Sequence, residues 1–253
     1  MRQDLNAVLV IGSAPEAVVV TSWDLSAYTN CVAINNAWQL SEQWTDLIYP
    51  EDFPSDRMPA LPIQPFQKLI TAKEFVPHQN DLGGFIYAGG TMAFTAGYWA
   101  LGALKPDLIA YVGCDMVYTS ENDAARHFYG HGTADPLRTD MTLQSLEAKS
   151  VRLMALAHAQ NCAVVNLSQR PDSRLVFPRL HHAEISRDMN HTELLAIQSK
   201  LLVKDKISEA LAIEKKLGYM VESGRYWESE TEFDKDALKA IDAVWLSAIN
   251  SAA

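Results

Sequence analysis

The sequence predicts an α/β protein with a mostly parallel sheet flanked by helices, followed by a helical C-terminal tail. Short, wholly apolar runs rich in β-branched residues recur along most of the chain. Such runs are typical of strands that are covered on both faces. Segments with helical periodicity lie between these runs, as the crossover helices of a parallel sheet do. After these runs, the chain changes to a purely helical pattern.

The expected strands are short, and most of them end at residues that interrupt a strand. A Gly-Ser-Ala-Pro turn, two asparagines, a proline and a glycine follow the first four in that order, and each of these is a turn signal. In chain order the strands are Ala7 to Ile11, Cys31 to Ile34, Asp46 to Tyr49, Leu108 to Val112 and Ala163 to Leu167.

Two helices are expected within the body of the protein. The apolar run Phe85-Ile86-Tyr87 leads into Gly89-Gly90, and an apolar helix follows from about Thr91 to Leu104. A second helix covers Leu143 to Gln160, where apolar residues recur at helical spacing. Both helices lie between expected strands and would therefore cover the sheet.

Two further segments are expected to be irregular. Pro50 to Pro77 contains six prolines, and a segment so rich in proline cannot form one regular element. We therefore expect an excursion over the sheet. Glu121 to Asp140 is polar and contains several turn residues, which predicts a loop or lid over about residues 116–140.

The pattern from about Ser186 onward predicts helices. Leucines and isoleucines recur at helical spacing up to Leu217, and a last helix is expected from about Asp234 to Ile249. The pair Asp234 and Asp236 is interpreted as acidic residues at that helix start. We expect a body over residues 1–185 and a tail over residues 186–253, which either packs on the body or mediates a homo-oligomer or partner contact.

Composition and charge exclude several classes of protein. The 253 residues include 21 lysines and arginines against 31 aspartates and glutamates, a formal charge of −10. Such a chain repels phosphate backbones, so general nucleic-acid binding is disfavoured. The three cysteines lack the spacing of a disulfide framework or a zinc site. With no secretory signal and no apolar stretch of roughly 20 residues, we expect a cytoplasmic protein without a transmembrane segment.

In open parallel sheets, ligands bind beyond the carboxyl ends of the strands. The first such turn, Gly12-Ser13-Ala14-Pro15, lacks the further glycines of G-x-G-x-x-G and the lysine of a P-loop. NAD and FAD are therefore disfavoured. The small residues of this turn would still let a phosphate or ribose approach backbone N–H groups.

Two other turns carry polar or glycine residues. The amides of Asn35 and Asn36 could bind a sugar hydroxyl or a base edge, or could merely cap the next element. Gly89, Gly90 and Thr91 open the apolar helix. The N–H groups there could bind an anion or carboxylate, and a simple tight turn is the alternative.

The stretch from Gly113 to Gly132 is the richest in candidate side chains. Asp115 follows a strand, where a lone acid commonly caps or orients a loop. Tyr118 and Tyr129 could donate hydroxyls to a phosphate. A solvated loop without a site is the alternative for the whole stretch.

Two histidines in this stretch, His127 and His131, could act as a base near neutral pH. Their i, i+4 spacing is also typical of metal ligands. However, Gly130 lies between them and no acid follows in H-E-x-x-H form. We therefore expect no metal at this site.

Four stretches in this order resemble the bacterial sialyltransferases of glycosyltransferase family 42 and their relatives. The resemblance extends over about residues 7–180. The first motif is a strand followed by Gly12-Ser13-Ala14-Pro15-Glu16, and the second is Ala33-Ile34-Asn35-Asn36. The third is Tyr87-Ala88-Gly89-Gly90-Thr91-Met92. The fourth is Gly113-Cys114-Asp115-Met116-Val117-Tyr118, with His127-Phe128-Tyr129-Gly130-His131-Gly132 further along the chain.

The resemblance implies a Rossmann-like domain with a lid and a metal-independent, inverting glycosyltransferase. The donor would be a CMP-activated, sialic-acid-like sugar, no cofactor would be needed, and a glycan or other compound would supply the acceptor hydroxyl. His131 falls on the general base, and Tyr118 or Tyr129 would stabilise the departing phosphate. Ser13 and Asn35 fall on nucleotide-contacting positions, and Gly90-Thr91 on a donor-contacting turn.

A second hypothesis is a nucleotide-binding or interaction protein that has the same fold and no transferase activity. Two departures from the family pattern motivate it: Ser13 replaces an asparagine, and Phe128 replaces a tyrosine. The long helical tail also fits an interaction role.

Overall fold

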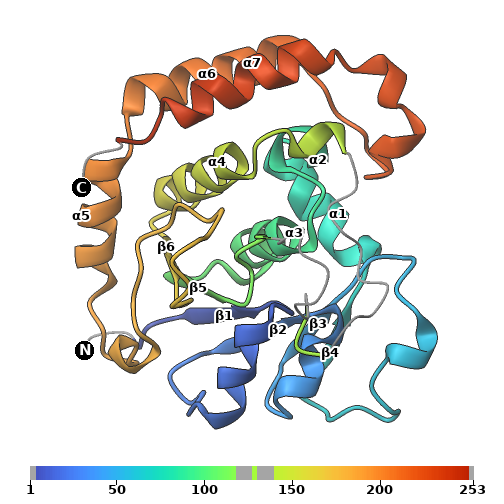
Figure 1. Ribbon diagram of the computed structural model, residues 1–253, viewed down its shortest axis with the longest axis vertical. Helices are drawn as coiled ribbons and strands as arrows, with labels where there is room; N and C mark the ends of the chain where they lie inside the picture. The colour runs from blue at the N-terminus through green and yellow to red at the C-terminus, as the bar shows by residue number, and fades with distance from the viewer. Residues whose placement is uncertain (1–3, 118–126, 130–139, 251–253) are drawn as a thin grey trace.

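The fold was analysed in a computed structural model that describes residues 4–117, 127–129 and 140–250. Its centre is a six-stranded, all-parallel sheet with the strand order β4-β3-β2-β1-β5-β6 (Figure 1). The predicted α/β class is confirmed, and each of the five expected strands agrees with the structure to within one residue. The strands are β1 (Ala7–Ile11), β2 (Asn30–Ile34), β3 (Asp46–Ile48), β4 (Lys68–Ile70), β5 (Leu108–Val112) and β6 (Ala163–Asn166).

Helices cover both faces of the sheet, with the α-helices α1 to α4 on one face and short 3₁₀ helices on the other (Figure 1). The α-helices are α1 (Ala72–Asp81), α2 (Phe85–Ala88), α3 (Met92–Trp99), α4 (Leu146–Ala159), α5 (His191–Leu201), α6 (Lys204–Leu217) and α7 (Lys235–Leu246), and α3 continues into a π-helical turn, η4 (Ala100–Leu104). The 3₁₀ helices are η1 (Pro15–Ser22), η2 (Asn35–Leu40), η3 (Ser55–Arg57), η5 (Met141–Leu143), η6 (His182–Glu184), η7 (Tyr226–Glu228) and η8 (Glu230–Glu232).

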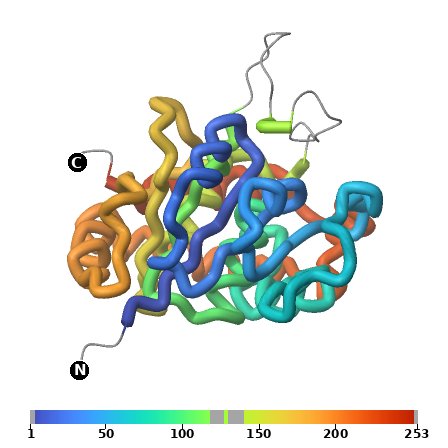
Figure 2. Tube along the Cα trace, turned by 90° about the horizontal axis from the view of Figure 1, so that it is seen from below, coloured from blue at the N-terminus to red at the C-terminus, as the bar shows by residue number. Residues whose placement is uncertain are grey.

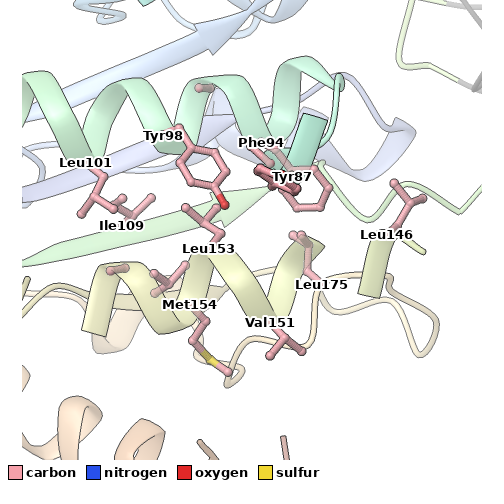
Figure 3. Close-up of a cluster of buried hydrophobic side chains, with 14 of the residues drawn as sticks. Tyr87, Phe94, Tyr98, Leu101, Ile109, Leu146, Val151, Leu153, Met154 and Leu175 are labelled. Carbon is pink, nitrogen blue, oxygen red and sulfur yellow. The ribbon is translucent and has the colours of Figure 1, made fainter. Parts of the chain in front are cut away.

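The wholly apolar strands are explained by a core on each side of the sheet. In β1, Val8 and Val10 belong to the core beneath the α-helices, whereas Leu9 and Ile11 belong to the core beneath η1 and η2. Successive strand residues point to opposite faces, so both sets must be apolar. On the α-helical side, side chains of α3 and α4 meet over β5, as Tyr98, Leu153 and Ile109 do in Figure 3.

The expectation that Pro50 to Pro77 is wholly irregular was wrong. The segment contains β4 at the sheet edge and the beginning of α1. The carboxylate of Glu74 accepts hydrogen bonds from the backbone N–H and the hydroxyl of Thr71, at 2.8 and 2.6 Å, which stabilises the helix start. Pro77 lies inside α1, where it removes one backbone hydrogen bond, but the buried Phe75 anchors this helix in the core.

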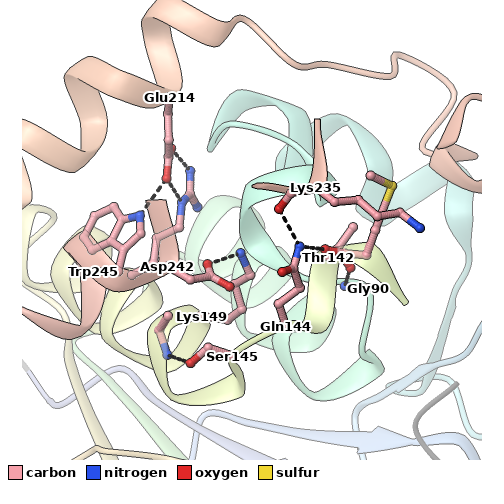
Figure 4. A network of polar contacts seen from close by, with 12 residues as sticks. Gly90, Thr142, Gln144, Ser145, Lys149, Glu214, Lys235, Asp242 and Trp245 are labelled. Atoms are coloured by element: carbon pink, nitrogen blue, oxygen red, sulfur yellow. Dashed lines mark hydrogen bonds and ion pairs between the residues drawn. The ribbon is translucent and has the colours of Figure 1, made fainter. Parts of the chain in front are cut away.

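The C-terminal helices pack on the body through α4. Arg152 of α4 donates to both carboxylate oxygens of Glu214 in α6, each at 2.9 Å, and to the hydroxyl of Tyr98 at 2.7 Å. The indole of Trp245 in α7 donates to the same carboxylate at 2.8 Å. All four side chains are buried, and Figure 4 shows Glu214 and Trp245 meeting in this network.

A second buried ion pair joins α4 to α7. The ammonium group of Lys149 lies 2.6 Å from the carboxylate of Asp242, and both side chains are at most 5% exposed. Buried charges are tolerated only when they are paired, so α6 and α7 supply the counter-charges that the buried lysine and arginine of α4 require. The helix α5 lies along the β6 edge of the sheet, on the opposite side of the molecule from η3 and the loop around it (Figure 2).

Candidate functional site

A cavity of about 1080 Å³ lies at the carboxyl ends of the parallel strands. The segments directly after β1, β2, β3 and β5 all contribute to it. This is the edge at which α/β proteins bind ligands, and the volume slightly exceeds the roughly 300–1,000 Å³ typical of ligand pockets. The lining segments are Gly12–Pro15, Asn35–Asn36, Pro50–Pro54, Gly90–Ala93 and Gly113–Val117.

Two glycines let the turns after β1 and β5 cross in contact. A Cβ atom on Gly12 would overlap the carbonyl oxygen of Gly113, so only glycine fits at position 12. Gly113 itself has a φ of 68°, a conformation that favours glycine. The amide of Ala14 donates to Gly113 at 3.1 Å. This crossing holds Ser13 at the cavity wall.

The described segment 127–129 lies over the first turn. The hydroxyl of Ser13 is 2.7 Å from Nδ1 of His127, and the amide of Phe128 donates to the Ser13 carbonyl at 3.1 Å. The rings of His127 and Tyr129 stack with centroids 5.0 Å apart, and both residues line the cavity. An imidazole and a phenol, both able to exchange protons, are thus held beside the turn after β1.

The turn after β2 presents a buried oxygen without a donor. Asn35 has a φ of 52°, which an asparagine tolerates better than most residues. Its Oδ1 is buried, and no hydrogen-bond partner for it exists among the described residues. Buried polar atoms are normally hydrogen-bonded, and a rotation of the Asn35 side chain into the cavity would let this oxygen accept from a ligand N–H or O–H group.

The glycine turn before α3 contributes only in part. Gly90 and Thr91 line the cavity, whereas Gly89 packs under the turn, with a hypothetical Cβ 3.1 Å from Leu143 and Lys149. The amide of Gly90 already donates to the hydroxyl of Thr142 at 2.9 Å. A side chain from another segment therefore occupies the Gly90 amide, and anion binding by the other N–H groups of this helix start stays a prediction.

Asp115 is not the lone acid that the sequence suggested. It lies beside Glu16, and burial followed by the hydrogen bond to Asp115 raises the pKa of the Glu16 carboxyl. Burial opposes ionisation of Asp115 as well, but hydrogen bonds from Glu16 and neighbouring polar side chains outweigh it and lower the Asp115 pKa. The two pKa values are shifted in opposite directions, so Glu16 takes up a proton before Asp115 does as the pH falls. Arg170 lies 3.5 Å from the Glu16 carboxylate.

A Glu16→Gln substitution is expected to remove a pH-dependent loss of stability. The raised Glu16 pKa stabilises the folded state fully below its ordinary value of 4.5, and this contribution is lost as the pH rises through the folded-state pKa. Glutamine cannot ionise but can still donate to Asp115. Melting temperatures between about pH 4.5 and pH 8 should therefore fall more steeply for the unmodified protein than for the variant.

The control for this measurement is Glu42→Gln, which alters an exposed residue in a loop. Its melting temperatures should follow those of the unmodified protein. Parallel curves for Glu16→Gln and the unmodified protein would contradict the raised Glu16 pKa.

The structure brings most of the predicted site residues to one cavity. Tyr118 and His131 lie outside the described residues, and their roles stay predictions. The residues of the prediction that line the cavity are Gly12, Ser13, Ala14, Asn35, Asn36, Gly90, Thr91, Gly113, Asp115 and Tyr129.

The sequence did not predict that the segment between α6 and α7, here called the C-terminal arm, forms part of the cavity wall. This arm, residues 218–234 between α6 and α7, brings Arg225, Tyr226 and Trp227 to the cavity. The hydroxyl of Tyr226 donates to Asp140 and lies against Gly90. Burial, followed by the contact with Asp140, raises the Tyr226 pKa. The only hint in the sequence is the Tyr-Trp pair shortly after Gly224.

Charge in the cavity is mixed. Three arginines and five carboxylates line its described part, so a phosphate would find cations but also repulsion. These residues are Arg57, Arg170 and Arg225, and Glu51, Asp52, Asp115, Asp140 and Glu230.

The described residues and the comparisons set limits on the identity of the site. Within residues 4–117, 127–129 and 140–250, no three His, Cys, Asp or Glu side chains are grouped so that they could hold a metal ion. In the same part of the chain, every helix is too short or too polar to cross a bilayer. No family model matches the chain, and neither a curated protein nor a solved structure is significantly similar to it.

Proposed function

We propose that the chain is an inverting glycosyltransferase that transfers a sialic-acid-like sugar from a CMP-activated donor to a hydroxyl acceptor without a metal ion. The observation that supports this proposal is that the separate motifs of the resemblance surround one cavity. Gly12 to Ala14, Asn35, and Gly90-Thr91 lie far apart in the sequence but line the same space at the sheet edge.

The unpartnered oxygen of Asn35 suits the nucleotide base. Cytosine carries an exocyclic amino group that donates hydrogen bonds, whereas uracil carries a carbonyl oxygen at the equivalent position. An acceptor that is buried and lacks a donor favours the ligand that supplies one. Uracil can donate only through its N3–H, so the proposal places the exocyclic 4-position of the base against this oxygen, where cytidine donates and uridine does not.

The transfer step requires a base and a stabilised leaving group. The acceptor oxygen forms a bond to the anomeric carbon as the bond from that carbon to the phosphate oxygen breaks, and CMP departs. His131, assigned by the resemblance, accepts the acceptor proton. The Tyr129 hydroxyl and the Arg170 guanidinium, which both line the cavity, would stabilise the charge that develops on the phosphate.

One observation favours the second candidate, a nucleotide-binding protein without transferase activity. The ionised Asp115 is 1% exposed and belongs to the cavity wall, so it repels a phosphate that comes close. A protein that only binds a nucleoside or a neutral ligand would not require this repulsion to be overcome.

Calorimetry with CMP and UMP tests the proposal. CMP should bind more tightly than UMP. Asn35→Gly should weaken CMP binding about tenfold and leave UMP binding nearly unchanged, because glycine tolerates the φ of 52° but removes the amide oxygen. Asn35→Asp is the matched control, since its carboxylate still accepts the cytosine amino group.

A donor-turnover assay completes the test. CMP-sialic acid should release CMP faster with protein than without it. Equal affinity for CMP and UMP would contradict the base assignment. Tight CMP binding without turnover of the donor would favour the second candidate.

A further inference from the structure

The C-terminal arm forms part of the cavity wall. In Figure 1 this arm extends beyond α6 and α7 toward α1 and α2. Gly224 has a φ of 76°, and a hypothetical Cβ there would lie 2.8 Å from Val76 of α1 and 3.1 Å from Phe85 of α2. The arm is therefore pressed closely against the body where it enters the cavity.

Polar contacts fix the arm on the body. The carboxylate of Asp140 accepts from Tyr226 and from Thr142, and Thr142 in turn accepts from the amide of Gly90. In addition, the side chain of Asn80 donates to the carbonyl of Glu222 at 2.9 Å. The arm and the donor-side turn at Gly90 thus share one hydrogen-bond network, so the position of one is set by the other.

Trp227 of the C-terminal arm is an exposed residue of the cavity wall. It lines the cavity, yet 57% of its surface is accessible to solvent. Its ring meets that of Tyr226 edge-on, with centroids 5.4 Å apart and planes at 75°. An indole that is oriented by a neighbour and left uncovered offers a flat apolar surface, and aromatic residues of this kind are typical anchors for ligands.

Beside Trp227 lies an ion pair that can exchange partners. Arg225 and Glu51 are 3.0 Å apart, and their side chains are 47% and 52% exposed. Exposed pairs contribute only about 0–1 kcal/mol, so a ligand can replace either partner at low cost. The guanidinium donates and the carboxylate accepts, which together match a compound that bears several hydroxyls.

The charges at this end of the cavity disfavour an anionic ligand. Three carboxylates, Glu51, Asp52 and Glu230, line it against two arginines, Arg57 and Arg225. A neutral ring with one apolar face and several hydroxyls satisfies both the indole and the polar groups beside it. Neutral sugars have this combination.

We propose that Trp227, with Arg225 and Glu51 beside it, forms a binding site for a neutral carbohydrate at the arm end of the cavity. The carbohydrate is the acceptor of the transfer, an assignment that rests on the proposed function. Its ring stacks on the indole, and its hydroxyls bond to the guanidinium and the carboxylate. The acceptor hydroxyl then points toward the first strand turn, Gly12 to Ala14, which lines the same cavity.

Calorimetric titration with lactose, maltose and cellobiose, each with and without saturating CMP, tests this site. At least one disaccharide should bind the unmodified protein. Trp227→Ala should weaken that binding about tenfold, while CMP affinity should change less than twofold. Trp227→Phe should restore much of the sugar affinity, because it keeps an aromatic face.

Phe66→Ala is the matched control, since Phe66 is 54% exposed and does not line the cavity. It should leave sugar binding unchanged. Failure of all three disaccharides to bind, or an equal loss of CMP and sugar affinity in Trp227→Ala, would overturn the carbohydrate site. Sugar binding without CMP binding would instead overturn the donor assignment and leave this site in place.

Discussion

The Arg152→Met variant is expected to lose about 3–5 kcal/mol of unfolding free energy, because it leaves the Glu214 carboxylate buried without its counter-charge. Glu214 is 6% exposed and receives two hydrogen bonds from Arg152. Among the residues that the structure describes, the indole of Trp245 would be the remaining side-chain donor to it. Urea denaturation at neutral pH measures the change, and the loss should appear as a lower midpoint at unchanged slope.

Two further variants show whether the effect belongs to the buried charge. Lys206→Met breaks an ion pair on the same helix, α6, but that pair is 44% and 47% exposed. It should cost less than about 0.5 kcal/mol. Adding Glu214→Gln to Arg152→Met removes the stranded charge and should recover part of the loss. Equal effects of Arg152→Met and Lys206→Met would show that the network does not stabilise the fold.

The His131→Ala variant is expected to transfer sugar roughly 10²- to 10⁴-fold more slowly, the usual contribution of a general base. CMP affinity should be retained, because the imidazole acts on the acceptor and not on the nucleotide. Initial rates of CMP release with an acceptor present, together with calorimetry of CMP, separate these two effects.

Other histidines serve as comparisons for this experiment. His181→Ala changes an exposed residue that does not line the cavity, and its rate should match that of the unmodified protein. His127→Ala removes the imidazole that contacts Ser13. If His127→Ala abolishes transfer while His131→Ala does not, the base has been assigned to the wrong histidine.

Local pattern was sufficient to predict the central strands. A run such as Ala7 to Ile11 is apolar on both faces, and only a strand between two cores requires that arrangement. The edge strand β4 was missed because an edge strand does not require a continuous apolar run: in Lys68–Ile70 the lysine is exposed. Prolines on both sides of it further concealed the strand and the start of α1.

The helices of the tail were predicted from periodicity, but their packing was not. Arg152 and Glu214 are 62 residues apart, and no local signal links two charged residues over such a distance. An arginine on a helix is normally exposed. Only the tertiary structure shows that this one has a buried acid as its partner.

The part of the candidate site that could be predicted consists of residues placed there by the sheet topology. Residues after parallel strands share one sheet edge, which is why Ser13, Asn35 and Asp115 come together. No such rule predicts which side chains from other loops and helices contribute to the site. Glu16 beside Asp115, Thr142 on the Gly90 amide and Trp227 on the arm could not be inferred, since each depends on how loops and helices pack.

The buried pairs between α4 and the last two helices affect how this protein can evolve and be engineered. A chimaera joined near residue 185 would combine Arg152 and Lys149 with foreign segments that lack Glu214 and Asp242. Each mismatch would leave a stranded charge in the interior. A functional chimaera must therefore take α4 and the last two helices from the same parent. Otherwise, both members of each buried ion pair must be replaced together.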